Sequence, residues 1–212
     1  MMVIAIDGPA GSGKSTIARA LADRLGLQYL DTGAMYRAAT FAALRDRVDL
    51  DDEDAVVAAT LAEPIDVAER VMVGDHDATE DIRGPEVSAA VSVVAALPGV
   101  RRIMRDRQRA WAATHGGGVM EGRDIGTVVF PDATLKVYLT ASPEVRARRR
   151  AAEKGTVDDA TIAEWSANIE LRDHRDSTRS DSPLMEAADA VVVDTSDVPV
   201  DEVVGQIVSM IR

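Results

Sequence analysis

The sequence predicts an α/β protein of three layers (α/β/α), in which a sheet of five short parallel strands has helices on both faces. Short apolar runs of strand length alternate along the chain with segments whose apolar residues recur at helical spacing. The first apolar run leads into a glycine-rich turn and then a helical segment, which is the context that a phosphate-binding loop requires. At 212 residues, the chain is long enough for one domain with a small insert.

The order of the elements follows from local signals. Strands are expected at residues 2–6, 27–30, 119–120, 135–139 and 190–193. Helices are expected at residues 17–25, 32–44, 55–62, 85–97, 98–113, 160–179 and 200–211, and one more begins at Pro143. Gly26 suits the end of the first helix, and Asp31 or Thr32 suits the start of the second. The three glycines at 116–118 are expected to form a loop.

The pattern changes between residues 64 and 87, where short β-runs replace the helical spacing. Strands are expected at 65–67 and 71–73, and residues 77–82 resemble a weak edge strand, so we expect a small antiparallel insert. His76 lies among acidic residues in this segment. Their spacing fits no metal-site template, and we therefore expect a solvated loop there.

Composition excludes several classes of protein. The net charge of -12 argues against nucleic acid as a partner. No apolar run is long enough to span a bilayer, and no signal-like segment precedes the glycine-rich turn. The absence of cysteine excludes disulfides and thiolate metal sites and fits a cytoplasmic protein. Only three of the 24 basic residues are lysines, so phosphate ligands would have to be met mainly by arginines.

The glycine-rich turn has the spacing Gly, four residues, Gly-Lys-Ser. Its glycines let backbone N–H groups converge on one point, and the following helix adds partial positive charge there. Lys14 is expected to reach the β- and γ-phosphates, and the Ser15 hydroxyl is expected to bind Mg²⁺. The residues of the loop are Gly8, Pro9, Ala10, Gly11, Ser12, Gly13, Lys14, Ser15 and Thr16. A chance glycine-rich turn is the alternative, and the flanking strand and helix argue against it.

Other charged clusters lie where a second ligand could bind. Residues 121–124, Glu-Gly-Arg-Asp, follow an expected strand, and ligands of open parallel sheets bind beyond the carboxyl ends of the strands. One helix face carries Arg172, Arg175, Asp176 and Arg179. Spacing alone leaves open whether this face holds an anion or is a self-paired solvated face. Thr32, Tyr36 and Arg37 fit a second anion or base site, although spacing favours a helix cap with surface polar residues.

Taken together, these motifs are similar to those of the bacterial cytidylate kinases, a family of P-loop nucleoside monophosphate kinases, over the whole chain. The resemblance rests on residues 6–16, 30–37, 122–131 and 172–179, with 182–184 close behind. It implies transfer of the γ-phosphate of ATP to CMP or dCMP, giving CDP or dCDP and ADP, with Mg²⁺ as cofactor. It further implies a cytoplasmic, monomeric enzyme of pyrimidine nucleotide metabolism without nucleic-acid or membrane partners. The single domain, 1–212, would contain a CMP-binding insert at 60–91 and a short lid at 150–158.

The resemblance also implies roles for individual residues. The catalytic residues would be Lys14, Arg146, Arg149 and Arg172. Residues 8–16 would bind the phosphates of ATP. The acceptor would be bound by Thr32, Tyr36, Arg37, Ser92, Arg101, Asp124, Arg172, Asp176 and Arg179. Within this set, Ser92 and Arg101 resemble the pair that reads cytosine, and Asp176 would take a sugar hydroxyl.

Two other functions fit parts of the sequence. A P-loop kinase for UMP, AMP or a non-nucleotide such as shikimate would share the glycine-rich loop, but residues 122–131 and the Ser92 and Arg101 pair argue against it. A nucleotide-dependent switch protein would need only one phosphate site, and the second arginine cluster argues against that. A panel of acceptors, with ADP release measured for each, would distinguish all three.

Overall fold

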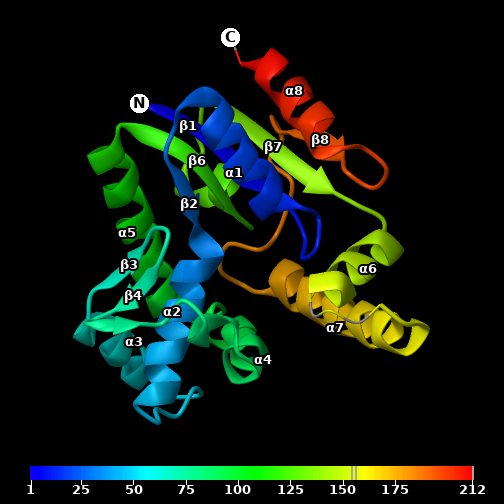
Figure 1. Ribbon diagram of the computed structural model, residues 1–212. Coiled ribbons are helices and arrows are strands. Elements are labelled where there is room, and N and C mark those ends of the chain that lie inside the picture. The colour runs from blue at the N-terminus through cyan, green and yellow to red at the C-terminus, as the bar shows by residue number, and fades with distance from the viewer. Residues whose placement is uncertain (154, 156, 212) are drawn as a thin grey trace. The chain divides into compact units, whose positions relative to one another are not determined.

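The computed structural model describes residues 1–153, 155 and 157–211 (Figure 1). The chain forms two compact units, of which the first combines Met1–Tyr29 with Ala112–Arg212 and the second is Leu30–Trp111. The expected insert at 60–91 lies within the second unit. Its role in binding CMP stays a prediction.

The main sheet, most of which belongs to the first unit, has five strands in the order β2-β6-β1-β7-β8. Their bounds are β1 Met2–Asp7, β2 Tyr29–Asp31, β6 Gly117–Gly122, β7 Leu135–Thr140 and β8 Val191–Asp194. β1 lies at the centre and pairs in parallel with β6 and β7, so that Ile4 is opposite both Val119 and Leu135. This confirms the predicted five-stranded parallel sheet and brings the carboxyl ends of β1, β6 and β7 to one edge.

Helices of the first unit pack on the sheet and on one another. They are α1 Lys14–Leu25, α6 Pro143–Glu153, α7 Asp159–Thr178 and α8 Val200–Met210. α1 packs beside α8, and a fully aliphatic core with Ile6, Leu21 and Ile207 lies between them and the sheet (Figure 1). α6 packs beside α7, where Ala147 and Ile169 meet a residue of the glycine-rich loop. This contact places the α6–α7 pair against that loop.

The second unit is mainly helical. It contains α2 Thr32–Arg45, α3 Glu53–Ala62, α4 Pro85–Val94 and most of α5 Pro98–His115, together with the antiparallel strands β3 Ile65–Val67, β4 Val71–Val73 and β5 His76–Asp77. As expected, Asp31 caps α2 through a hydrogen bond from Ala34 N (2.8 Å). The expected antiparallel insert is present as the sheet β3-β4-β5, but its edge strand is His76–Asp77 and does not extend to residue 82. Asp77 accepts hydrogen bonds from the Thr79 backbone and hydroxyl, and the chain turns there. The chain then enters the short helix η1 Asp81–Arg83.

Two of the glycines expected in a loop are in fact strand residues. Gly117 and Gly118 pair with Met2 and Val3 as the start of β6. Gly117 has φ +115, and a Cβ there would lie 2.0 Å from the carbonyl oxygen of Met2. The glycines therefore permit a close approach between neighbouring strands, which a turn-based interpretation of Gly-Gly-Gly does not anticipate.

Within the described residues, no single helix has both the length and the apolar character needed to cross a membrane.

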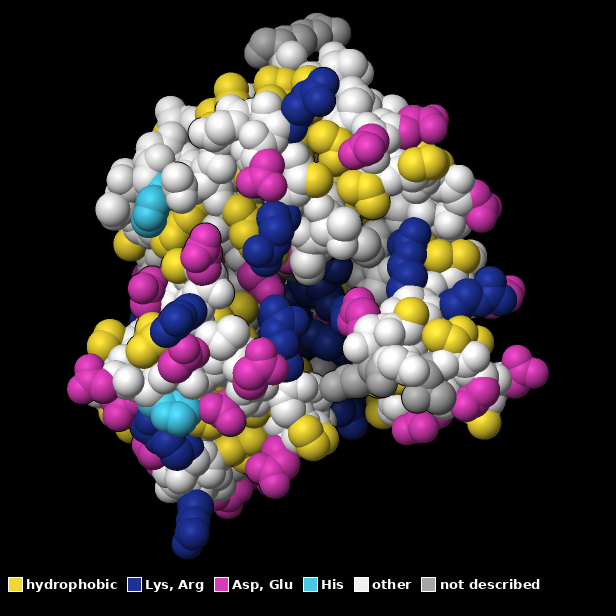
Figure 2. Space-filling view, in the orientation of Figure 1, with side chains coloured by type: hydrophobic (Ala, Val, Ile, Leu, Met, Phe, Trp, Pro, Cys, Tyr) yellow, Lys and Arg dark blue, Asp and Glu magenta, His cyan; other side chains and the backbone are white. Residues whose placement is uncertain are grey.

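Acidic side chains are scattered over the face drawn in Figure 2, in keeping with the net charge of -12.

Candidate active site

The glycine-rich loop after β1 uses its glycines where other residues would clash. Gly8 has φ +152, and a Cβ there would lie 2.1 Å from the carbonyl oxygen of Leu139 on β7. Gly11 and Gly13 have φ +77 and +84. α1 begins directly after Gly13 and has no side-chain cap, so its first N–H groups are available to a bound anion.

Lys14 is buried within this loop. Its Nζ donates a hydrogen bond to the carbonyl oxygen of Pro9 at 2.7 Å. Burial lowers the pKa of the Lys14 ammonium well below its usual value, and the positive charge of Arg123 lowers it further, against the opposing charge of Glu121. A phosphate placed beside Lys14 would favour the charged form, because an opposite charge raises the pKa of an ammonium group.

One residue of the loop and one residue packed against it indicate that the loop fits a phosphorylated ligand. The hydroxyl of Ser12 is fully buried and, within the described part of the chain, has no hydrogen-bond partner. The same holds for Nε of the buried Arg146. Unsatisfied buried donors are uncommon and costly, and phosphate oxygens are the acceptors that such donors suit. Ser15 and Thr16 are exposed on the first turn of α1.

Arg146 and Arg149, both on α6, donate hydrogen bonds to the backbone of the glycine-rich loop. Nη1 of Arg146 donates to the carbonyl oxygen of Ala10 at 3.1 Å. Arg149 donates to the carbonyl oxygen of Gly11 at 3.4 Å and to the carbonyl oxygen of Thr195 at 2.6 Å. The structure therefore brings both predicted arginines to the glycine-rich loop. Their catalytic role stays a prediction.

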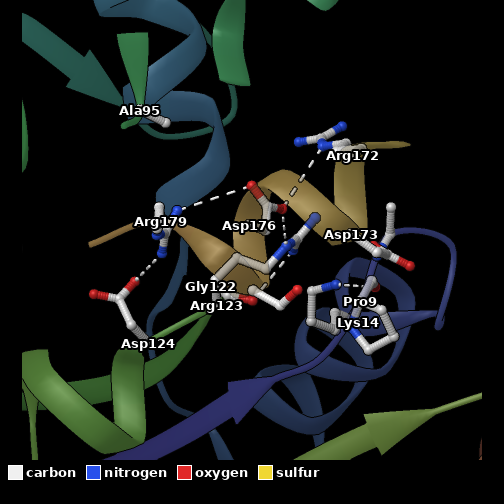
Figure 3. A network of polar contacts seen from close by, with 12 residues as sticks. Pro9, Lys14, Ala95, Gly122, Arg123, Asp124, Arg172, Asp173, Asp176 and Arg179 are labelled. Carbon is white, nitrogen blue, oxygen red and sulfur yellow. Dashed lines mark hydrogen bonds and ion pairs between the residues drawn. The ribbon is translucent and has the colours of Figure 1, made fainter. Parts of the chain in front are cut away.

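A cluster of five charged residues, called here the arginine cluster, lies at the end of β6 and the end of α7. It consists of Arg123, Asp124, Arg172, Asp176 and Arg179. In Figure 3, Arg123 and Arg172 converge on Asp176, with separations of 2.9 and 4.0 Å from Nε to Oδ2. Arg179 lies between the two acids, 3.6 Å from Asp124 and 3.9 Å from Asp176. The cluster thus presents three guanidinium groups in a fixed arrangement.

Asp176 is ionised because of its neighbours. Burial alone would raise the pKa of its carboxyl group, but Arg123, Arg172 and Arg179 outweigh burial and hold the pKa below its ordinary value. The cluster still carries three arginines against two acids. Within the cluster, this surplus of positive charge favours the binding of an anion.

The helical face predicted at 172–179 is only partly correct. Asp176 is buried and Arg172 half-buried, but Arg175 is exposed. α7 ends at Thr178, and Arg179 adopts an extended backbone conformation. Arg179 reaches Asp124 from beyond the helix, and its Nε donates to the carbonyl oxygen of Ser182 at 2.7 Å. A helical spacing rule could not place it.

Neither Arg123 nor Asp7 was singled out from the sequence as a residue of the site. Arg123 lies in the Glu-Gly-Arg-Asp segment, whose position at a strand end was the available signal, but nothing in its spacing pairs it with Asp176. Asp7 ends β1, and its two carboxylate oxygens accept hydrogen bonds from the backbone of Ile125 (2.9 Å) and Gly126 (2.7 Å). These amides begin a short π-helical turn, Ile125–Val129, directly after Asp124.

The other predicted acceptor residues belong to the second unit. Arg101 is 1% exposed, its guanidinium lies 5.4 Å from the ring centre of Tyr36, and its Nη1 donates to the carbonyl oxygen of Ala95 at 3.1 Å. Arg37 forms an ion pair with Asp31 at 2.8 Å. Thr32 is buried at the start of α2, and Ser92 is half-buried on α4. The structure joins Arg101 to Tyr36, and a shared acceptor site stays a prediction.

Comparisons with known proteins agree with this chemistry. A family model described as cytidylate kinase matches residues 4–212. The cytidylate kinase of Rhodococcus opacus (strain B4) is 49% identical, covering 99% of this chain and 94% of that protein. That of Lactiplantibacillus plantarum is also 49% identical, covering 98% and 93%. The solved shikimate kinase of Acinetobacter baumannii in complex with shikimate has a TM-score of 0.50 at 14% identity, covering 100% and 93%, which supports the fold alone.

Proposed function

The chain belongs to the cytidylate kinase family, and from this premise we propose that it transfers the γ-phosphate of ATP to CMP or dCMP. The observation that carries the proposal is the family match along the whole chain, on a fold that places a phosphate-binding loop and the arginine cluster in one unit. The products are CDP or dCDP and ADP.

In this proposal, the glycine-rich loop binds the donor. Backbone N–H groups of residues 8–16 and the start of α1 hold the β- and γ-phosphates, and Lys14 balances their charge. The buried Ser12 hydroxyl and Arg146 Nε support this assignment, because both need an acceptor. Arg149 holds the loop in shape through Gly11 and Thr195.

The residues present also fit Mg²⁺ as cofactor. Mg²⁺ prefers oxygen ligands and keeps several waters and phosphate oxygens, so it needs few protein ligands. The exposed hydroxyl of Ser15 on the first turn of α1 provides an oxygen ligand of the kind that Mg²⁺ prefers. When bound there, the ion would neutralise charge on the β- and γ-phosphates.

The arginine cluster is proposed to hold the acceptor. Arg172 and Arg179 bind its phosphate, and the Asp176 carboxylate accepts a hydrogen bond from a sugar hydroxyl. Thr32, Tyr36, Arg37, Ser92, Arg101 and Asp124 are proposed as the other acceptor contacts. The buried guanidinium of Arg101 supports a base-reading role, because its hydrogen bond and its Tyr36 contact hold it in one orientation. Arg123 extends this set as a third guanidinium beside Asp176.

The reaction requires positioning more than proton transfer. An oxygen of the CMP phosphate attacks the γ-phosphorus as the bond from that phosphorus to the β–γ bridging oxygen breaks, and ADP leaves with the bonding electrons. The acceptor is already an anion at neutral pH, so no side chain has to act as its base. Arginines beside the glycine-rich loop and in the arginine cluster would stabilise the negative charge on the phosphate oxygens in the transition state.

A closing segment would keep water from the γ-phosphate. We propose residues 150–158 for this role within a single domain, 1–212, whose segment 60–91 binds the acceptor. Residues 154 and 156 of this segment lie outside the described part of the chain. We further propose a monomer in the cytoplasm, acting on nucleotides and not on nucleic acid or membranes. The acidic net charge supports the absence of nucleic acid.

The test is a panel of acceptors with purified protein, ATP and Mg²⁺. We expect ADP release that depends on CMP or dCMP, with CDP or dCDP identified by chromatography. UMP, AMP and shikimate are the controls. A protein that binds ATP but releases ADP at the same rate with and without every acceptor would contradict the proposal, and preference for a control acceptor would reassign the substrate.

A further inference from the structure

Asp173 on α7 reaches the donor loop with both oxygens of its carboxylate. Oδ1 accepts a hydrogen bond from the backbone N–H of Ala10 at 3.1 Å. Oδ2 forms a charged hydrogen bond with Nη1 of Arg146. Because Nη1 of Arg146 also donates to the carbonyl oxygen of Ala10, the three residues form a closed ring of contacts. Asp173 has no place among the residues assigned so far.

The position of Asp173 on its helix gives this ring its significance. Arg172 precedes it, and Asp176 follows within the same helical turn, and both belong to the arginine cluster. Figure 3 shows Asp173 on the side of α7 that faces Pro9 and Lys14. One turn of a rigid helix therefore carries the proposed acceptor contacts and the link to the donor loop.

We propose that Asp173 is a positioning residue, which sets the distance between the donor phosphates and the acceptor phosphate by tying α7 to Ala10 and Arg146. The inference rests on the proposed function. Asp173 touches no reacting atom and acts through its two partners. In-line transfer is sensitive to placement, and a displacement of 1 Å can cost roughly 100-fold in rate.

Two reactions consume the γ-phosphate of ATP, namely transfer to CMP and hydrolysis, and they should depend differently on Asp173. Transfer to CMP needs the acceptor on α7 to be aligned with the donor loop. Hydrolysis uses water, which needs no alignment with α7. Loosening the Asp173 link should therefore lower transfer much more than hydrolysis, whereas a loss of folded protein lowers both in proportion.

Two variants divide the link into its parts. In Asp173→Asn, the amide oxygen can still accept from Ala10, but the charged contact with Arg146 is lost. In Asp173→Ala, both contacts are lost. Glu170→Gln is the matched control, since Glu170 is an exposed acid one turn earlier on the same helix.

The measurement is ADP release with and without saturating CMP, together with the KM for CMP. We expect transfer to fall by about 10- to 100-fold in Asp173→Ala and less in Asp173→Asn. Hydrolysis should change by less than about threefold, so the ratio of hydrolysis to transfer rises at least several-fold, and Glu170→Gln should match the unaltered protein. Because each ratio is taken within one sample, an unfolded fraction cancels.

An unchanged ratio in both Asp173 variants would overturn the inference, and so would faster transfer, which would make the carboxylate an obstacle. Failure of the unaltered protein to make CDP would instead refute the proposed function, so the two failures are distinguishable.

Discussion

Asp7 provides a direct test of how burial acts on a charge in this fold. Its side chain is 5% exposed and caps the turn that follows Asp124 through two backbone N–H groups. Burial raises the pKa of the Asp7 carboxyl group from 3.8 to about 6, and the backbone hydrogen bonds only partly oppose that shift. Because the pKa is higher in the folded state, Asp7 stays protonated in the folded protein at pH values between 3.8 and about 6, at which the unfolded chain has lost this proton.

The sign of the stability change follows from this difference. Between pH 3.8 and about 6 the folded state binds more protons, so the free energy of unfolding falls as pH rises through this window and levels off above it. Across the range from pH 5 to pH 7.5, the linkage relation gives a loss of about 1.4 kcal/mol from Asp7 alone. Asp7→Asn cannot titrate. It also leaves one backbone N–H without an acceptor, a pH-independent cost of about 1–3 kcal/mol.

The assay is urea unfolding of the protein and of Asp7→Asn at several pH values, followed by tryptophan fluorescence. The difference in unfolding free energy between the two proteins should shrink by about 1.4 kcal/mol from pH 5 to pH 7.5. Asp23→Asn, which alters an exposed carboxylate on α1, serves as the control for general charge effects. If the difference for Asp7→Asn stays constant over this range, Asp7 does not titrate as its burial requires.

Three further predictions concern the glycine-rich loop and Arg101, the residue proposed to read the base. Lys14→Ala should abolish CDP formation in the ADP-release assay, and near-normal turnover would exclude the assigned phosphate contact. In the same urea titrations, Gly8→Ala should lower the free energy of unfolding by at least ~2 kcal/mol, because the new Cβ would clash with the backbone of Leu139. Gly205→Ala, at an open position in α8, is the control and should raise the free energy of unfolding by about 0.5–1 kcal/mol. Arg101→Ala should reduce the ratio of kcat/KM for CMP over UMP by about 10-fold or more, and an equal loss for both nucleotides would contradict base reading.

The predictable part of the fold rests on signals carried by neighbouring residues. Gly26 ends α1 with φ +64, and Asp31 caps α2 through Ala34 N, each as the local sequence predicts. The parallel sheet follows in the same way from apolar runs separated by helices. The extent of the edge strand was wrong because the Asp77 side chain turns the chain after two strand residues. The loop expected at 116–118 was wrong because Gly117 permits a close approach to a distant strand.

Much of the candidate site was less predictable because its contacts join residues far apart in the sequence. The hydrogen bond between Arg123 and Asp176 spans 53 positions, that between Asp7 and Ile125 spans 118, and that between Ala10 and Asp173 spans 163. No periodicity reports such pairs. The phosphate-binding loop could be found because its function resides in nine consecutive residues, of which only the backbone and a few side chains matter.

The acids of the arginine cluster have two consequences that must be weighed together. Asp176 balances the guanidinium groups of Arg123 and Arg172, since buried charges without partners are costly. The same carboxylate competes with any anion for those groups. Three arginines against two acids resolve this conflict, because the pairs hold the guanidinium groups in place while a net positive charge is left to attract a phosphate. Removing Asp176 would therefore increase the positive charge of the cluster but lose its geometry, and in-line transfer depends on geometry.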